Sequence, residues 1–165
     1  MNTKQTETTT KLFELIEDIE FGMLVTEASD GALRSRPMSV KTTDSDQCLW
    51  FMTDKGSAKL LEIKENCQVN ISFAQPSGHK FVSVSGTASI TDDQSKIDEL
   101  WDSSAATWYP DGKDSPKLTL IRVEPDDAEY WCPKSNMFVS LFKIASAAMD
   151  GERPTDLGEN KKVEM

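Results

Sequence analysis

The sequence predicts a mostly β protein in which six short strands form a small antiparallel barrel, with helices inserted between some of them. Two patterns support this fold class. Segments such as Gln68-Val-Asn-Ile-Ser-Phe-Ala74 alternate apolar and polar residues, as strands with one buried face do. Short polar turn sequences, such as Ser29-Asp-Gly31, separate neighbouring strands as in hairpins. The regular alternation of strands and helices that builds a doubly wound sheet is not found, so that fold is disfavoured.

The N-terminal half is expected to supply an amphipathic helix, four strands and a short second helix. Apolar residues recur at helical spacing between Leu12 and Ile19, after a polar stretch (residues 1–10) that we expect to be a disordered lead. Strands are expected at residues 21–27, 32–42 and 47–53, with turns at 29–31 and 43–46. Ser57 then provides an N-cap for a helix over residues 58–65, and the strand at 68–74 follows.

The C-terminal half is expected to supply the remaining strands and two further helices. Thr91-Asp-Asp-Gln94 matches a capping box and predicts a helix to about Trp101, after a strand in which Gly86 marks a bulge or bend. The other expected elements are a strand at 81–90, a loop through 108–116, a strand at 117–123, a turn at 124–127, an extended piece at 128–131 and a helix at 137–149. Residues 11–149 are thus expected to form one domain. Residues 150–165 form a polar tail, of which 162–165 is a candidate last strand.

Composition excludes several classes of function. The chain has 165 residues and a formal net charge of -10, and such a field repels nucleic acids and anionic membranes, so we expect neither as a partner. No apolar run approaches the length of a membrane span and the N-terminus does not resemble a signal peptide, so a cytoplasmic location is expected. The three cysteines lack Cys-x-x-Cys spacing, and the only histidine, His79, lies in a turn. Neither a metal site nor a catalytic triad is therefore predicted.

Basic and hydroxyl residues gather in two segments that together indicate a site for a phosphate group. The segments are Arg36-Pro-Met-Ser-Val-Lys41 and Phe51-Met-Thr-Asp-Lys-Gly-Ser-Ala-Lys59. Lys59 falls in the first turn of the expected helix, where the helix dipole disfavours a cation unless an anion lies nearby. Taken alone, Lys59 is more simply a solvated surface lysine. Its neighbours Arg36, Lys41, Thr53 and Ser57 favour the phosphate.

The spacing of the basic residues leaves their arrangement open. Arg36 and Lys41 are five residues apart, so a regular strand would point them to opposite faces. Either the strand is bent there, or the two side chains serve different parts of one ligand. The glycines form neither a Gly-x-Gly-x-x-Gly loop nor a Walker loop, which disfavours a Rossmann or P-loop nucleotide site. A phosphate ligand must therefore be held in another way.

The two basic segments, in this order, resemble those of the flavin-binding split barrel of the pyridoxamine 5'-phosphate oxidase superfamily, and more closely its general stress protein 26-like branch. Residues 36–41 resemble the oxidase motif Arg-x-Val-Leu-Leu-Lys, and residues 51–59 resemble the next segment, an aromatic-x-Thr followed by Ser-x-Lys. Ser83-Val-Ser-Gly86 and Glu129-Tyr-Trp131 strengthen the branch assignment. The resemblance covers about residues 12–148 and implies a six-stranded antiparallel FMN-binding split barrel of Greek-key type.

The same resemblance implies a cofactor site for FMN, with FAD as the alternative. In the family, the arginine of the first motif meets the FMN phosphate and its lysine lies by the flavin ring, while the threonine and lysine of the second segment help to hold the flavin and its phosphate. The tryptophan approaches the flavin from the other subunit, so a homodimer is implied. The residues carried over to this chain are Arg36, Pro37, Met38, Lys41, Met52, Thr53, Ser57, Lys59 and Trp131.

Departures from the oxidase pattern argue against pyridoxamine phosphate oxidation. Ala58 stands where oxidases commonly carry a second basic residue, the flavin-contacting glutamine is not found near Lys80-Phe81, and no arginine follows Trp131 until Arg153. Three functions stay open: an FMN-dependent oxidoreductase of unknown substrate and electron donor, which we prefer; a non-catalytic protein that stores or senses flavin; and a split-barrel dimer that binds another cofactor. No catalytic side chain is predicted, because a flavin itself performs the difficult chemistry.

The aromatic residues and methionines have competing interpretations. Trp131 is favoured as a flavin neighbour by its position in the family, and Trp101 as a packing residue. For Trp108 and Tyr109, packing and ligand contact both stay open. The methionines on expected strands are most simply core residues, namely Met23, Met38 and Met52.

Overall fold

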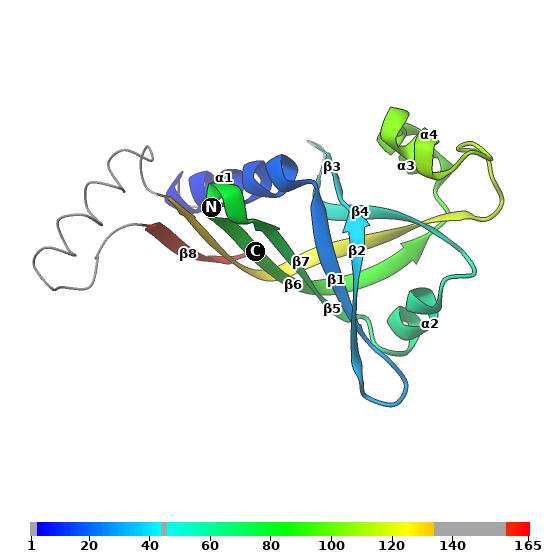
Figure 1. Ribbon diagram of the computed structural model, residues 1–165, viewed down its shortest axis with the longest axis horizontal. Helices are drawn as coiled ribbons and strands as arrows, with labels where there is room; N and C mark the ends of the chain where they lie inside the picture. The colour runs from blue at the N-terminus through cyan, green and yellow to red at the C-terminus, as the bar shows by residue number, and fades with distance from the viewer. Residues whose placement is uncertain (1–2, 44–45, 134–157) are drawn as a thin grey trace, which may run out of the picture.

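The computed structural model describes residues 3–43, 46–133 and 158–165, most of which belong to one antiparallel sheet that curves as a half-barrel (Figure 1). The strands follow the order β2-β1-β5-β6-β7-β4-β3, and β8 pairs with β7. Their bounds are Phe21–Glu27 (β1), Leu33–Ser39 (β2), Lys41–Thr43 (β3), Asp46–Asp54 (β4), Gln68–Gln75 (β5), Lys80–Thr91 (β6), Leu118–Pro133 (β7) and Gly158–Glu164 (β8). The mostly antiparallel barrel class is confirmed, although the described sheet has eight strands where six were expected.

The described helices lie against the sheet or at its ends (Figure 1). They are α1 (Thr3–Ile19), α2 (Ala58–Glu65), the short 3-10 helix η1 (Pro76–Gly78), α3 (Gln94–Leu100) and α4 (Ser103–Trp108). Because α1 begins at Thr3, most of the lead that we expected to be disordered is helical. The division of the chain into lead, domain and tail otherwise stays a prediction.

Two details of the helices after β6 differ from the sequence prediction. The N-cap of α3 is Asp93, whose carboxylate accepts hydrogen bonds from the N–H groups of Ser95 and Lys96, whereas Thr91 still belongs to β6. The helix α4 was not predicted. Its N-cap is Asp102, whose carboxylate accepts a hydrogen bond of 2.8 Å from the Ala105 N–H.

The strand β7 runs through the segment where we expected a turn. Residues 124–127 have a turn-like composition, but the register of β6 against β7 shifts there, with Ser85 opposite Asp127 and Gly86 opposite Pro125. A β-carbon on Gly86 would lie 2.3 Å from the carbonyl oxygen of Glu124, so this close approach of two strands requires glycine. The bulge predicted at Gly86 is confirmed, and residues 124–127 belong to β7 at this bulge and not to a turn.

The strand expected at residues 32–42 is divided at Val40. β2 pairs with β1, whereas β3 pairs with β4. Val40 lies between them, is buried in the core, and donates its N–H to the Glu20 carbonyl at 2.9 Å. The chain is therefore interrupted between Arg36 and Lys41, which places the two cations on different strand pairs.

The core has two parts, one under α1 and α2 and a smaller one under α3 and α4. Trp101 packs against the smaller cluster, as predicted, and Met52 is buried in it. Met38 packs against the larger cluster, but Met23 is 40% exposed, so its assignment to the core was wrong. All three cysteines are free thiols.

The described part of the tail adds to the sheet. β8 begins earlier than the expected strand at 162–165, and its Val163 is buried in the larger core cluster. The helix expected at residues 137–149 lies outside the described residues. Within the described ranges, no helix has both the length and the apolar character needed to cross a membrane.

Candidate functional site

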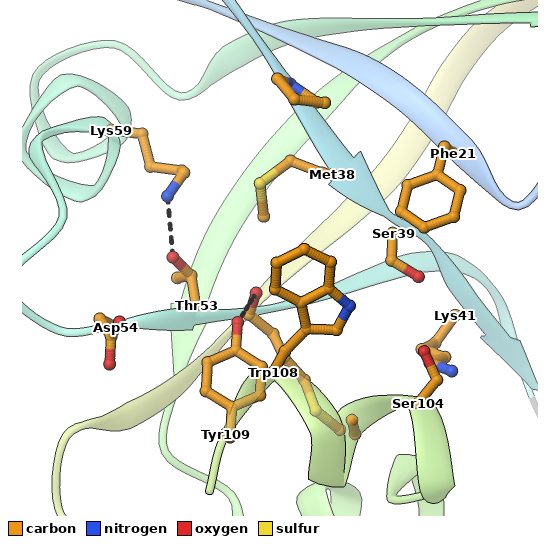
Figure 2. Close-up of a pocket in the computed structure, with 13 residues that line it drawn as sticks. Phe21, Met38, Ser39, Lys41, Thr53, Asp54, Lys59, Ser104, Trp108 and Tyr109 are labelled. Carbon is orange, nitrogen blue, oxygen red and sulfur yellow. Dashed lines mark hydrogen bonds between the residues drawn. The ribbon is translucent and has the colours of Figure 1, made fainter.

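A cavity of about 380 Å³ lies where β1, β2, β3, β4, α2 and α4 meet. This volume is within the range of small-ligand pockets. Figure 2 shows Lys59 and Thr53 at one end, Lys41 and Ser104 at the other, and Trp108 between them. The lining residues are Phe21, Pro37, Met38, Ser39, Lys41, Met52, Thr53, Asp54, Lys59, Ser104, Ala105, Trp108 and Tyr109.

The ammonium group of Lys59 is the main electrostatic feature of the first end. Its Nζ donates to Thr53 Oγ1 at 2.8 Å and to Ser57 Oγ at 2.5 Å, and the residue is only 9% exposed. Burial lowers the pKa of Lys59, and the positive charge of Arg36 lowers this pKa further. No carboxylate among the described residues lies within ion-pair distance of Nζ. Asp54 and Glu62 raise the same pKa from a greater distance, so the direct partners of this buried cation are all neutral, and the arrangement fits an anionic ligand.

The start of α2 contributes to the same end of the cavity. Ser57 occupies the N-cap position, as predicted, but its side chain makes no capping bond and accepts from Lys59 instead. Each hydroxyl that accepts from the ammonium keeps its own proton, so Ser57 and Thr53 can both donate to a ligand oxygen. The start of a helix also carries unpaired backbone N–H groups, which favour an anion nearby.

The second end of the cavity is tied to α4 by an ion pair. Lys41 Nζ donates to the carboxylate of Asp102, which also caps the helix. The hydrogen bond from Lys41, together with the Ala105 N–H, lowers the pKa of Asp102. This pairing connects β3 to α4 and so fixes the helix that carries Trp108.

Two aromatic residues left open by the sequence both line the cavity. Trp108 is 68% exposed, so its indole is available to a ligand. Tyr109 donates its hydroxyl to the Met52 carbonyl at 2.8 Å and packs against the smaller core cluster. Burial, followed by the charge of Asp54, raises the pKa of Tyr109, so the phenol stays protonated and acts as a donor.

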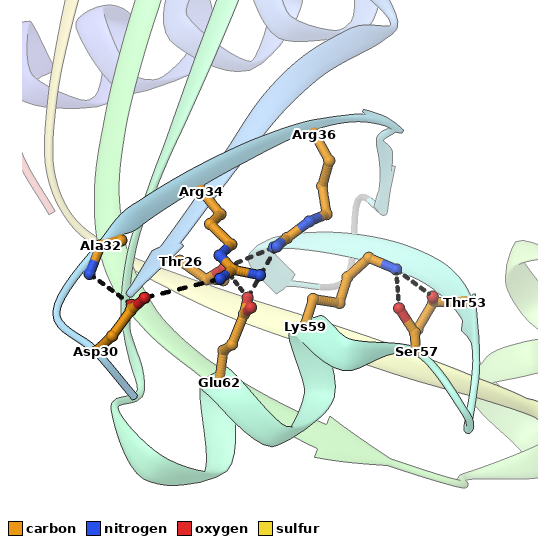
Figure 3. Close-up of polar contacts among 9 residues, drawn as sticks. All are labelled: Thr26, Asp30, Ala32, Arg34, Arg36, Thr53, Ser57, Lys59 and Glu62. Atoms are coloured by element: carbon orange, nitrogen blue, oxygen red, sulfur yellow. Dashed lines mark hydrogen bonds and ion pairs between the residues drawn. The ribbon is translucent and has the colours of Figure 1, made fainter. Parts of the chain in front are cut away.

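Arg36 lies outside the cavity, in a partly buried polar network beside it (Figure 3). Its Nη2 donates to Glu62 Oε2 at 2.9 Å and its Nη1 to Thr26 Oγ1 at 2.6 Å. The Thr26 hydroxyl donates to the same Glu62 oxygen at 2.5 Å. The hydrogen bond from Thr26, assisted by Arg36, lowers the pKa of Glu62, so this carboxyl is ionised at neutral pH.

The structure thus brings together only part of the predicted site. Six predicted residues line the cavity, and Ser57 contacts it through Lys59; the six are Pro37, Met38, Lys41, Met52, Thr53 and Lys59. Trp131 does not line it: this residue lies on β7, opposite Phe81 of β6 and Asn160 of β8. The ligand contacts of all nine predicted residues stay predictions.

Other lining residues gave weaker sequence signals. Phe21, Ser39, Asp54, Ser104 and Ala105 were not predicted, because each is unremarkable in its own segment. The signal for α4 was available in Asp102, an N-cap type of residue before two serines. Glu62 follows Lys59 by three residues and so shares its helix face, but its bond to Arg36 of β2 had no signal in the sequence. The described residues contain no acidic, cysteine or histidine cluster able to hold a metal ion.

The antiparallel half-barrel places this protein in the split-barrel class. The family model for pyridoxamine 5'-phosphate oxidase-like proteins matches residues 7–155, and the chain belongs to this family.

Several relatives within the family carry the name general stress protein 26. The Bacillus subtilis protein of this name is 29% identical over 120 residues, which cover 71% of this chain and 83% of its own. A solved general stress protein 26 homologue of Jannaschia sp. CCS1 has a TM-score of 0.81 at 25% identity, over 97% of this chain and 99% of that chain. A general stress FMN/FAD binding protein of Xanthomonas citri has a TM-score of 0.69 at 29% identity, over 80% of this chain and 93% of that one. The branch assignment made from the sequence is confirmed.

Proposed function

We propose that this protein binds FMN in the cavity, with the phosphate at the Lys59 end. The observation that carries this proposal is the buried Lys59 ammonium, which has only hydroxyl partners among the described residues. A phosphate would supply the missing negative charge, and Thr53 and Ser57 would donate to its oxygens. The name of the Xanthomonas citri relative, which includes both FMN and FAD, supports a flavin and leaves FAD as the alternative.

The middle of the cavity suits the flat ring of a flavin. Met38, Met52 and the exposed face of Trp108 provide apolar contact, while Lys41 and Ser104 lie at the far end. A bound flavin supplies hydride and electron transfer, whereas the protein binds it, orients it and excludes water. In this arrangement Tyr109 holds the cavity wall through its bond to the Met52 carbonyl.

An FMN-dependent oxidoreductase remains our preferred activity, and the substrate and electron donor are open. The alternative is a protein that binds flavin without turnover. Both use the same site, so they are separated by whether the flavin-loaded protein consumes NADH or NADPH steadily. A cytoplasmic location stays a prediction from the sequence.

A homodimer is the second part of the proposal, and exposed apolar side chains on the sheet support it. Phe21 and Met23 of β1, Phe81 of β6 and Trp131 of β7 are 38–49% exposed. Each alternates with buried neighbours, so they share the outer face of the sheet, and Phe81 lies directly opposite Trp131. Phe21 also lines the cavity. A second copy packed on this face would cover the apolar residues and close the cavity on that side.

The binding proposal is tested by titrating the purified protein with FMN, FAD and riboflavin, following flavin fluorescence. We expect FMN to bind more tightly than riboflavin, because only FMN carries the phosphate. If neither binds, the proposed function is wrong. If riboflavin binds as tightly as FMN, the phosphate is not at Lys59.

The dimer is tested by light scattering at micromolar concentration, on the wild-type protein and on Trp131→Glu. We expect a dimer that the substitution disrupts, since it places a charge in an apolar contact. A wild-type monomer that still binds FMN tightly would contradict the shared interface.

A further inference from the structure

Arg36 is the second cation that the sequence assigned to the phosphate, and in the structure it forms an ion pair with Glu62. The two partners differ in exposure. Glu62 has a side chain only 8% exposed and is fixed on α2, where Thr26, which is buried, also holds it. The Arg36 side chain is 24% exposed and extends from β2, at one end of the strand order. Arg36 is therefore the partner that can move toward a ligand.

Arg36 and Lys59 are electrostatic neighbours, although they have different partners. The charge of Arg36 contributes to lowering the pKa of Lys59. Figure 3 shows the two side chains reaching different groups, Arg36 to Glu62 and Lys59 to Ser57 and Thr53. Glu62 offsets the charge of Arg36, and Asp54, which lines the cavity and also acts on the pKa of Lys59, offsets the charge of Lys59. A phosphate monoester carries roughly two negative charges at neutral pH.

A phosphate that recruited Arg36 would have to replace its bond to Glu62. The free energy gained from the new contact is then offset by the broken ion pair and by a carboxylate left with Thr26 alone. The net benefit of a phosphate group is therefore close to that of Lys59 and its hydroxyls. A ligand that lacks the second negative charge therefore binds only slightly less tightly than a ligand that carries it.

We infer that Glu62 is a positioning residue that sets ligand specificity: by holding Arg36, it limits the preference of the site for a doubly charged phosphate monoester over the uncharged flavin. This inference rests on the proposed function and names the residue that tunes it. Its prediction is that neutralising Glu62 frees Arg36 for the phosphate and raises the affinity for FMN, while the affinity for riboflavin is unchanged.

The test compares Glu62→Gln with Glu65→Gln, measuring dissociation constants for FMN and riboflavin by fluorescence quenching. Glutamine keeps the size of the side chain and can still accept from Thr26, but its neutral amide binds the Arg36 guanidinium less strongly than the carboxylate does. Glu65 is an exposed residue of the same helix, so its substitution removes the same charge without touching the network. We expect Glu62→Gln to raise the ratio of FMN to riboflavin affinity roughly tenfold, the effect of about one charged hydrogen bond. Glu65→Gln should change it less than about twofold.

A second comparison shows whether Glu62 acts through Arg36. In an Arg36→Gln background, Glu62→Gln should give no increase in the ratio, because the freed cation is missing. An equal increase in both backgrounds would overturn the inference in favour of a general field effect. An unchanged or lower ratio in the single Glu62→Gln variant would overturn it as well.

The wild-type protein provides a measurement that does not depend on the variant folding. With Arg36 held by Glu62 and the phosphate bound by Lys59 and its hydroxyls, FMN should bind roughly tenfold to hundredfold more tightly than riboflavin. A ratio above about a thousandfold would mean that Arg36 already binds phosphate, and would overturn the inference. If neither flavin binds to any form of the protein, the proposed function itself is wrong. If both flavins bind and the wild-type protein already shows the high ratio of FMN to riboflavin affinity expected for a free Arg36, only the role of Glu62 is wrong.

Discussion

Two cations beside α2 meet opposite environments, although the sequence assigned both to the same ligand. Lys59 is buried with two neutral hydroxyls, at 2.5 and 2.8 Å. Arg36 is bonded to a buried carboxylate at 2.9 Å. Among the described residues, the first cation has no carboxylate within ion-pair distance, although Asp54 and Glu62 act on its pKa, and the second has one. A cluster of basic residues therefore identifies an anion site only when the partners of each cation are known.

The ionisation of these groups follows the same contrast. The pKa of Lys59 is lowered, mainly by burial, so the folded protein holds its proton less tightly than the unfolded chain does. The pKa of Glu62 is lowered mainly by Thr26 and also by Arg36, so its charge is stabilised by folding. An anionic ligand would stabilise the charge on Lys59, whereas it would have to compete for Arg36.

The largest expected effect is on stability, from Arg36→Leu. This substitution leaves Glu62 buried with only the Thr26 hydroxyl, and removing one partner of a buried pair is strongly destabilising. Because Arg36 is partly exposed, we expect the free energy of unfolding to fall by about 3 kcal/mol, at the lower end of such losses. Urea denaturation of the flavin-free protein measures this change.

Two matched variants show whether this loss belongs to the buried pair. Arg34→Leu removes an exposed arginine that lies 3.9 Å from Asp30, and should change stability by less than about 1 kcal/mol. Lys59→Met should also cost less than about 1 kcal/mol, since it leaves only two hydroxyls that can bond to water. If Lys59→Met destabilised as much as Arg36→Leu, the contrast between the two cations would be wrong.

The next effect is on ligand binding, from Lys59→Glu. This change places a negative charge against the proposed phosphate, so we expect the free energy of FMN binding to weaken by at least about 2 kcal/mol. Titration with FMN measures the loss, and Lys64→Glu, an exposed substitution on the same helix with the same charge change, serves as its control. Unchanged FMN affinity in Lys59→Glu would remove Lys59 from the site.

The fold was predictable to the extent that its signals were local. The alternation of Gln68–Gln75 and the spacing of the apolar residues in α1 predicted these elements correctly. The long strand β7 was not predicted as one element, because Pro125 and the acidic residues beside it have turn-like composition. That composition is compatible with a strand only at a bulge, which depends on the partner strand β6.

The site was predictable where one segment supplied several of its residues. Thr53, Ser57 and Lys59 come from β4 and the start of α2, and the structure brings them into direct contact. Glu62 and Thr26 were missed, because their effect on Arg36 depends on three elements that meet only in the folded chain. A polar residue on a strand or helix looks solvated until its burial is known.

The smallest expected effect is on the acid dependence of stability, and it tests the Glu62 network without any ligand. Folding lowers the pKa of Glu62 below its ordinary value of 4.5, because Thr26 donates to the carboxylate and the charges of Arg36 and Arg34 lie near it. The stabilisation is therefore complete above about pH 4.5 and is lost as the pH falls through the lowered pKa. In Glu62→Gln this loss should be smaller than in the wild type, by on the order of 1 kcal/mol, the scale of one hydrogen bond. Urea denaturation at neutral pH and at a series of values below pH 4.5 measures it, with Glu65→Gln as the control. Parallel losses in the wild type and Glu62→Gln would mean that Arg36 and Thr26 do not stabilise the ionised carboxylate, and the distinction between the two cations would then rest on Lys59 alone.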